Sequence, residues 1–226
     1  MSVLNPKADA QRAFDAMNTG GIAIMPMDVG YSIIAARPAP LAKIFATKGR
    51  APSKLNAMLG NDTIAHSLYK LDARGWEVLE AITHDYDLPL GAVAPFQSDH
   101  PHFAHLDAAT MAASTKDGTL LMLLNAGRFH AEITRLSAEH NMALFGSSAN
   151  RSMTGTKFDG ADIEPEIRAI AAVVIDYGLM KYHPWRQSST ILNLATLEVV
   201  RFGSCYENLR SILRRHFKAE LPVKPA

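Results

Sequence analysis

Cysteine, net charge and long apolar runs are the features that this sequence has least of. Its 226 residues include one cysteine, Cys205, so no disulfide can form within the chain and a reducing compartment is favoured. The formal net charge is only +1, which gives no overall field to attract nucleic acid. No apolar run approaches the roughly 20 residues of a membrane span, and the N-terminus lacks the pattern of a signal peptide. These absences predict a soluble cytoplasmic protein that does not contact membranes.

Several common catalytic motifs are also missing. The sequence has no Walker A motif, no dinucleotide-binding fingerprint and no nucleophile elbow. Cys205 stands where a helix is expected to start and is more typical of a small packing residue than of a reactive thiol. His100, His102 and His105 invite a zinc interpretation, but Pro101 interrupts them and their spacing matches no strong zinc motif. We therefore predict no metal site.

Apolar segments with helix-like and strand-like spacing alternate along the chain without a break in composition. Hydrophobic residues make up 48% and charged residues 20%, which suits a globular protein with a sizeable core. The alternation predicts one α/β domain over residues 8–217, followed by a loose tail over residues 218–226. Helices are expected at residues 8–18, 41–47, 75–82, 133–140 and 208–217. Strands are expected at residues 22–26, 31–35, 57–59, 119–124, 142–145, 173–176, 189–194 and 197–202.

The stretch from Leu88 to Thr115 shows little periodicity. It contains Pro89, Pro95 and Pro101, which interrupt regular structure. We expect loop and short strand here, and the most mobile part of the domain.

Basic side chains follow the helix expected at residues 41–47. Lys48 and Arg50 stand directly after it, and Lys54 precedes the next strand. A guanidinium flanked by ammonium groups suits the oxygens of a polyphosphate. The alternative is a solvated helix end, because cations at a helix C-terminus offset its macrodipole.

Hydroxyl and amide side chains follow the strand expected at residues 142–145. Ser147, Ser148 and Asn150 are small donors that can approach a ligand closely, and ligands of open α/β sheets bind near the carboxyl ends of strands. The alternative is a turn capped by its own side chains. Ser189, at the start of a strand, and Arg201, at the end of another, repeat the pattern more weakly. We expect the basic and the hydroxyl-rich stretches to close around one triphosphate.

The order of these segments resembles the YrdC/YciO family, whose best-known activity is threonylcarbamoyl-AMP synthesis. The family's Pro-Thr-Asp/Glu-Thr-x-Tyr-Gly-Leu motif corresponds to residues 26–33, and its Lys-x-Arg-Pro motif to Lys48 and Arg50, with Pro52 displaced by one position. Its Ser-Thr-Ser-Ala-Asn, Ser-Thr-Ile-Val-Asp and Arg-x-Gly motifs correspond to residues 146–150, 189–193 and 201–203. The resemblance spans residues 10–203. It implies a single-domain twisted mixed β-sheet with flanking helices and a concave, positively lined cavity.

The resemblance also implies an enzyme that joins L-threonine, bicarbonate and ATP, with Mg²⁺, into threonylcarbamoyl-AMP and pyrophosphate for tRNA modification. Such a reaction needs orientation and neutralisation of phosphate charge rather than a protein nucleophile. The positions corresponding to the family's ATP site are Lys48, Arg50, Lys54, Thr119, Ser148, Asn150, Thr156 and Arg201. The positions corresponding to its amino-acid and acceptor site are Met27, Asp28, Tyr31, Leu123, Gly146 and Ser189.

Departures from the family pattern gather at the amino-acid positions. Met27 and Val29 replace two threonines, Gly146 replaces a hydroxyl residue, and Leu123 stands where an arginine would hold a carboxylate. Hydrogen bonds to charged groups contribute about 1.5–3 kcal/mol each, so threonine would bind roughly ten- to a hundredfold more weakly. We expect ATP binding to persist beside an altered amino-acid pocket.

Two other functions stay open. A module that binds double-stranded RNA or tRNA fits the family's basic cavity, and the last helix places Arg210 and Arg214 on one face. A solvated helix face explains the same charges. The other possibility is a member that senses a nucleotide without turnover, which the absence of pyrophosphate release would reveal.

Overall fold

The computed structural model describes residues 3–49 and 54–224, so Arg50 lies outside the described residues. Within them, ten strands form one mixed sheet in the order β10-β9-β4-β6-β3-β7-β2-β1-β8, with β5 paired to β6. The strands are β1 Ala23–Met25, β2 Ser32–Ala35, β3 Ala57–Leu59, β4 Leu90–Pro95, β5 Thr115–Lys116, β6 Thr119–Leu124, β7 Phe145–Ser148, β8 Val173–Val174, β9 Ile191–Asn193 and β10 Val199–Arg201. This arrangement confirms the predicted α/β fold with a mixed sheet.

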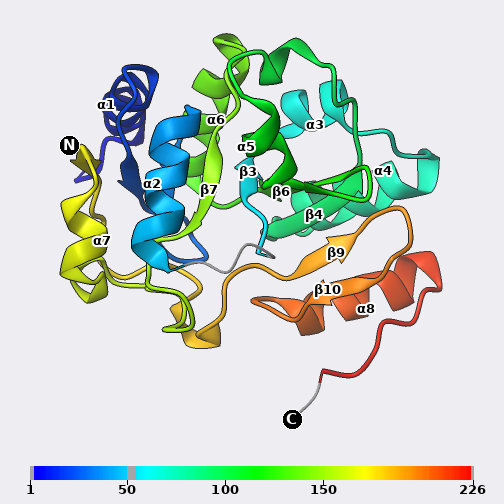
Figure 1. The fold of residues 1–226 in the computed structure, drawn as a ribbon. Helices are drawn as coiled ribbons and strands as arrows, with labels where there is room; N and C mark the ends of the chain where they lie inside the picture. The colour runs from blue at the N-terminus through cyan, green and yellow to red at the C-terminus, as the bar shows by residue number, and fades with distance from the viewer. Residues whose placement is uncertain (1–2, 50–53, 225–226) are drawn as a thin grey trace.

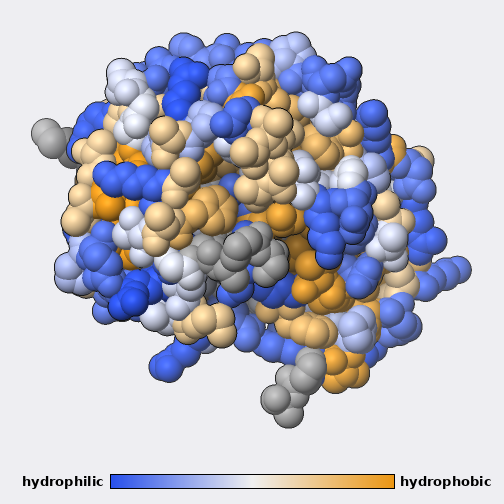
Figure 2. Space-filling view, viewed as in Figure 1, coloured by the Kyte–Doolittle hydropathy of each residue, from blue (hydrophilic) through white to orange (hydrophobic). Residues whose placement is uncertain are grey.

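Helices flank the sheet along its length. They are α1 Pro6–Asn18, α2 Pro38–Lys48, α3 Asp62–Leu68, α4 Ala73–Glu80, α5 Ala108–Ala112, α6 Arg128–Glu139, α7 Pro165–Ala169 and α8 Tyr206–Phe217. Figure 1 shows α8 beside β9 and β10 at one end of the sheet, and α1 and α7 at the other. Apolar side chains gather over α2 and α5 in the space-filling view (Figure 2), where a groove of about 800 Å³ runs between these helices. No helix of the described residues has the length and apolar character to cross a membrane.

The stretch after Leu88, where we expected loop and short strand, contains strand β4 and also helix α5, which was not predicted. Strand β4 pairs antiparallel with β6 and parallel with β9, so it is a central strand. Its prolines did not prevent this, because Pro89 precedes the strand and Pro95 is its last residue. Gly91 is required where the strands meet, since a Cβ there would lie 2.8 Å from Ile191 Cγ1.

Strand β7 begins later than the sequence predicted. It starts at Phe145 rather than at Met142, so Ser147 and Ser148 lie inside the strand instead of after it. Each of the two serines therefore points to a different face of the sheet, because successive side chains alternate along a strand.

Several helices also differ from those that the apolar periodicity predicted. Helix α6 begins at Arg128, five residues before the apolar pattern became clear, and α3 had no predicted counterpart. The start of α3 did carry a local signal, because Asn61 Oδ1 accepts a hydrogen bond from Ile64 N at 3.0 Å. Helix α4 continues as a π-helical turn over Ala81–Asp85.

The segment after α8 differs from the loose tail that we expected. Leu221 is buried, and its carbonyl oxygen accepts a hydrogen bond from Arg210 Nε at 3.1 Å. Tyr206 also donates its hydroxyl hydrogen bond to the carbonyl of Pro222. Residues 219–222 therefore fold back along the last helix.

Candidate active site

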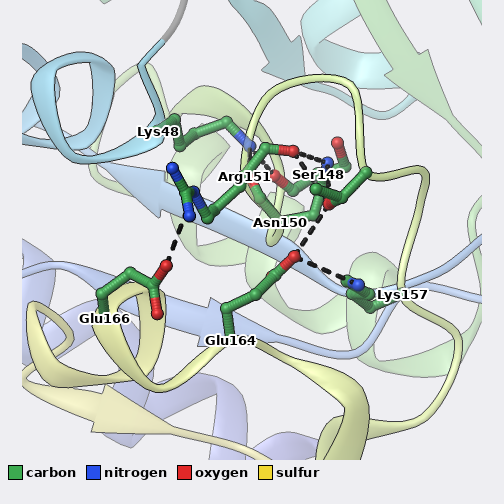
Figure 3. Close-up of polar contacts among 8 residues, drawn as sticks. Lys48, Ser148, Asn150, Arg151, Lys157, Glu164 and Glu166 are labelled. Carbon is green, nitrogen blue, oxygen red and sulfur yellow. Dashed lines mark hydrogen bonds and ion pairs between the residues drawn. The ribbon is translucent and has the colours of Figure 1, made fainter.

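The end of α2 and the loop after β7 are joined by one lysine. The ammonium of Lys48 donates hydrogen bonds to the main-chain carbonyls of Ser148 and Asn150, and its side chain is buried (Figure 3). Gly49 ends α2 in the left-handed conformation, at φ 58°, and Ser152 N donates to the carbonyl of Lys48 at 2.9 Å. The basic and the hydroxyl-rich stretches thus meet in space. In this arrangement Lys48 fixes the loop through its carbonyls.

A polar network holds the loop that follows. Thr154 Oγ1 donates to Glu164 Oε1 at 2.8 Å, and Lys157 Nζ lies 3.1 Å from the same oxygen (Figure 3). Burial raises the pKa of the Glu164 carboxyl, but its own backbone, Thr154 and Lys157 outweigh that effect and lower it. Sequence reasoning missed Glu164, because it is ten residues beyond its partner and belongs to no motif.

One buried amide atom in this loop lacks a partner. Asn150 is 5% exposed, and its Oδ1 has no hydrogen-bond partner among the described residues. Its Nδ2 donates to the carbonyl of Arg151, which fixes the side chain. A buried acceptor left unsatisfied costs about 1–3 kcal/mol, so this atom marks a place where a ligand can donate a hydrogen bond. Ser147 Oγ is likewise unsatisfied, on the other face of the strand.

Strand pairing places several predicted site residues on one face of the sheet. Ser148 pairs with Ser32, and Gly146 pairs with Ala57, two residues before Leu59. Leu59 in turn pairs with Leu123. Paired residues share a face, so Ser148, Gly146 and Leu123 lie on the same side. We call this side the ligand face.

Ser189, two residues before β9, reaches the ligand face. Leu123 pairs with Gly91, and a Cβ on Gly91 would lie 3.3 Å from Ser189 Oγ. Ser189 Oγ therefore occupies the space over Gly91, next to Leu123. Thr119 is on the same side of β6 as Leu123, although its Oγ1 donates to the carbonyl of Lys116 at 2.7 Å.

The middle of the ligand face is apolar. Leu59, Leu121, Leu123, Val93 and Ile191 all point to it, and Leu123 is 8% exposed. Two hydrogen bonds fix the backbone of Leu123. Its carbonyl oxygen accepts them from Gly60 N and His130 Nε2, each at 3.0 Å. The guanidinium of Arg201 stands at the border of this apolar region, where its Nη2 lies 3.4 Å from Ser189 Oγ.

Cations stand toward the two ends of the ligand face. Lys54 Nζ lies 3.3 Å from Met153 Sδ, near the loop after β7. Arg201 Nη2 donates to the carbonyl of Ser189 at 2.7 Å on the far side. Strands β7 and β9 are four neighbours apart, which is roughly 19 Å along a flat sheet. Arg201 and Ser148 are thus at opposite ends of the face.

The first motif contributes to the fold and to a second region. Met27 is buried, and the hydroxyl of Tyr31 donates to Asp176 Oδ1 at 2.8 Å, which together with burial raises its pKa. The carboxylate of Asp28 is directed away from the ligand face, against Gly127 and 3.8 Å from Lys181 Nζ. Thr156 packs its methyl group on Gly30, where a Cβ would approach to 2.3 Å.

His102 and Cys205 are buried within the fold. His102 lies 3.3 Å from Asn141 Oδ1, and burial lowers its pKa to about 4. No cluster of three or more His, Cys, Asp or Glu residues arranged to hold a metal ion is found in the described part of the chain. Cys205 is buried before α8, which raises the pKa of its thiol to about 11.

Comparisons with known proteins show the family and the fold. The family model named Sua5/YciO/YrdC and described as telomere recombination matches residues 15–203. A search of curated proteins finds no match. A hypothetical protein, smu.1377c, from Streptococcus mutans UA159 has a similar structure, with a TM-score of 0.78, 18% identity and coverage of 93% of this chain and 92% of that chain.

Two further solved structures share the fold. YciO from E. coli has a TM-score of 0.67 and 15% identity, over 89% of this chain and 93% of its own. Sua5 from P. abyssi, solved in complex with L-threonine, has a TM-score of 0.67 and 16% identity. The match covers 85% of this chain but only 52% of that Sua5 chain.

Proposed function

This chain belongs to the Sua5/YciO/YrdC family, and we propose that it is an ATP-dependent nucleotidyltransferase of the threonylcarbamoyl-AMP synthase type with an altered amino-acid pocket. The observation that carries the proposal is the junction of Lys48 with the loop of Ser148 and Asn150, beside the unsatisfied Asn150 Oδ1. A fixed loop with an unused acceptor is preorganised for a ligand that donates hydrogen bonds, such as a nucleoside.

The proposed reaction balances without a protein nucleophile. An amine and bicarbonate combine as a carbamate, which attacks the α-phosphorus of ATP; pyrophosphate leaves and water is released. ATP enters as its Mg²⁺ complex, so the metal is part of the substrate. Lys54, with Arg50 from outside the described residues, would neutralise phosphates, while Arg201 stays a predicted contact at the far end of the ligand face. Ser148 and Asn150 would hold the nucleoside, while Thr119 and Thr156 stay predicted contacts.

The acceptor side of the site supports a departure from threonine. Leu123 and Gly146 supply neither charge nor hydroxyl, and most of the side chains around Leu123 on the ligand face are apolar, with Ser189 the hydroxyl beside it. A carboxylate placed against Leu123 and Gly146 would lose its hydration without a direct cationic partner, because Arg201 is held on Ser189 instead. We propose that the acceptor amine has no carboxylate at this position, and that the product enters tRNA modification only if threonine itself proves to be accepted.

Calorimetry and product analysis test both halves of the proposal. Titration with Mg²⁺–ATP should give saturable heat, and adding threonine should change the ATP affinity little. Pyrophosphate release should then be measured with bicarbonate and a panel of amines that includes threonine and simple alkylamines. ATP binding without pyrophosphate release from any amine would favour the nucleotide-sensing alternative. Absence of ATP binding would contradict the proposal that this protein is an ATP-dependent enzyme.

The RNA-binding alternative draws less support from the last helix. Arg210 is engaged with the carbonyl of Leu221, so it does not join Arg214 in an open basic stripe. Titration of tRNA and duplex RNA at two salt concentrations decides this point, since binding driven by phosphates must weaken steeply with salt.

A further inference from the structure

A second cavity lies away from the ligand face. It has a volume of about 730 Å³ and opens between the end of β6, the start of α6 and residues 177–182. Its volume is within the range of pockets that hold small molecules. Its charged lining residues are Asp28, Asp87, Arg128 and Lys181.

Two carboxylates enter this cavity from different loops. Asp87 Oδ1 accepts a hydrogen bond from Asn125 Nδ2 at 2.9 Å, which orients it. Asp28 is held against Gly127, where a Cβ would lie 2.2 Å from Asp28 Oδ1. Burial raises the pKa of Asp28; the nearby Lys181 lowers it, and the charge of Asp87 raises it again. Asp28 is thus partly desolvated beside the charge of the exposed Asp87, an arrangement that an incoming ammonium group would relieve.

Two cations, Lys181 and Arg128, line the same cavity. Lys181 Nζ is 3.8 Å from Asp28 Oδ2, which is longer than a hydrogen bond. Arg128, at the first position of α6, makes no ion pair with any residue that the structure describes. Both cations are exposed, so an anion that enters the cavity beside the acids can reach them.

Part of the cavity lining is aromatic and aliphatic. Phe129 is buried and meets the Tyr177 ring edge-on, with centroids 6.0 Å apart. Met180 is buried, while Leu179 is largely exposed at the rim. The cavity thus combines carboxylates, cations and an apolar surface.

We infer that this cavity binds a small dipolar molecule with an apolar body, the chemistry of a free hydrophobic α-amino acid. The ammonium group would lie between Asp28 and Asp87, and the carboxylate would meet Lys181 and Arg128. The side chain would pack on Phe129 and Tyr177. This site is separate from the proposed nucleotide site and does not depend on it.

Calorimetric titration with L-leucine and L-phenylalanine tests the inference. Two analogues of leucine with a single charged group, 3-methylbutylamine and 4-methylpentanoate, serve as comparisons. We expect saturable binding of both amino acids and at least tenfold weaker binding of each analogue. No saturable binding of either amino acid, or equal affinity for the analogues, would overturn the inference.

Substitutions locate the binding. Asp28→Asn and Lys181→Gln should each weaken leucine binding at least tenfold, whereas the exposed controls Asp99→Asn and Lys70→Gln should leave it unchanged. Asn150→Ala, at the proposed nucleotide site, should also leave it unchanged, so the two sites can fail independently. Thermal unfolding of each variant confirms that it is folded. Binding that survives both cavity substitutions in folded protein contradicts the assignment.

Discussion

The ammonium of Lys48 donates to the main-chain carbonyl of Asn150, 102 residues further along the chain. This contact fixes the end of α2 against the loop after β7. It also positions the amide of Asn150, whose Oδ1 has no partner within the described chain. The proposed nucleotide site depends on this relationship.

Replacing Lys48 should therefore release the loop. Lys48→Met leaves two buried carbonyls without their donor, and we expect the free energy of unfolding to fall by about 1–3 kcal/mol. Affinity for ATP should fall with it, because the loop would no longer be fixed. Urea denaturation and ATP titration measure the two effects. Lys43→Met, on the exposed side of the same helix, is the matched control and should change neither.

The acidic partner of the loop gives a second prediction. Glu164→Gln removes the ion pair with Lys157, and amide hydrogen exchange over residues 150–157 should become faster. Glu166→Gln breaks only a 3.5 Å contact between exposed side chains and should alter stability by less than about 0.5 kcal/mol. Equal exchange rates in the two variants would show that Glu164 does not hold the loop.

Stability should fall in mild acid because of buried histidines. Burial lowers the pKa of His130 to about 4 from its ordinary 6.5, and His102 behaves likewise. The unfolded chain then binds more protons than the folded one between those pH values, so stability declines as pH falls from about 6.5 to 4. The loss is roughly 3 kcal/mol at most for each histidine. Denaturation curves across this range should be less pH-dependent in His130→Gln, but not in the exposed control His66→Gln.

An added cation should restore an amino-acid pocket. Leu123→Arg places a guanidinium on the ligand face, and threonine affinity in the presence of ATP should rise about ten- to a hundredfold. Some loss of stability is expected because Leu123 is buried. Leu123→Met controls for the change of shape and should not bind threonine more tightly. Unchanged threonine affinity in folded Leu123→Arg would place the acceptor elsewhere.

Local sequence patterns predicted much of the fold and the meeting of the two polar stretches. They failed where long-range pairing decides the structure. Leu90–Pro95 became a central strand because Gly91 allows β9 to approach closely, a fact that depends on Ile191 and not on its neighbours in sequence. A start of β7 only three residues later than predicted placed Ser147 and Ser148 on opposite faces.

Long-range contacts also decide where two of the predicted site residues lie. Asp28 belongs to a motif associated with the amino acid, yet its backbone N–H donates to the carbonyl of Ala126 at 2.8 Å, and its side chain enters a separate cavity. Tyr31 is likewise drawn to Asp176 and away from the ligand face. These two contacts join segments 98 and 145 residues apart in the sequence, and no local spacing encodes them.

Titration of the protein with Mg²⁺–ATP, beside its Asn150→Ala variant, tests the central claim most directly. We predict saturable binding that weakens at least tenfold in the variant while its thermal unfolding stays close to that of the unaltered protein. No binding, or equal affinity in the two proteins, would contradict the nucleotide site.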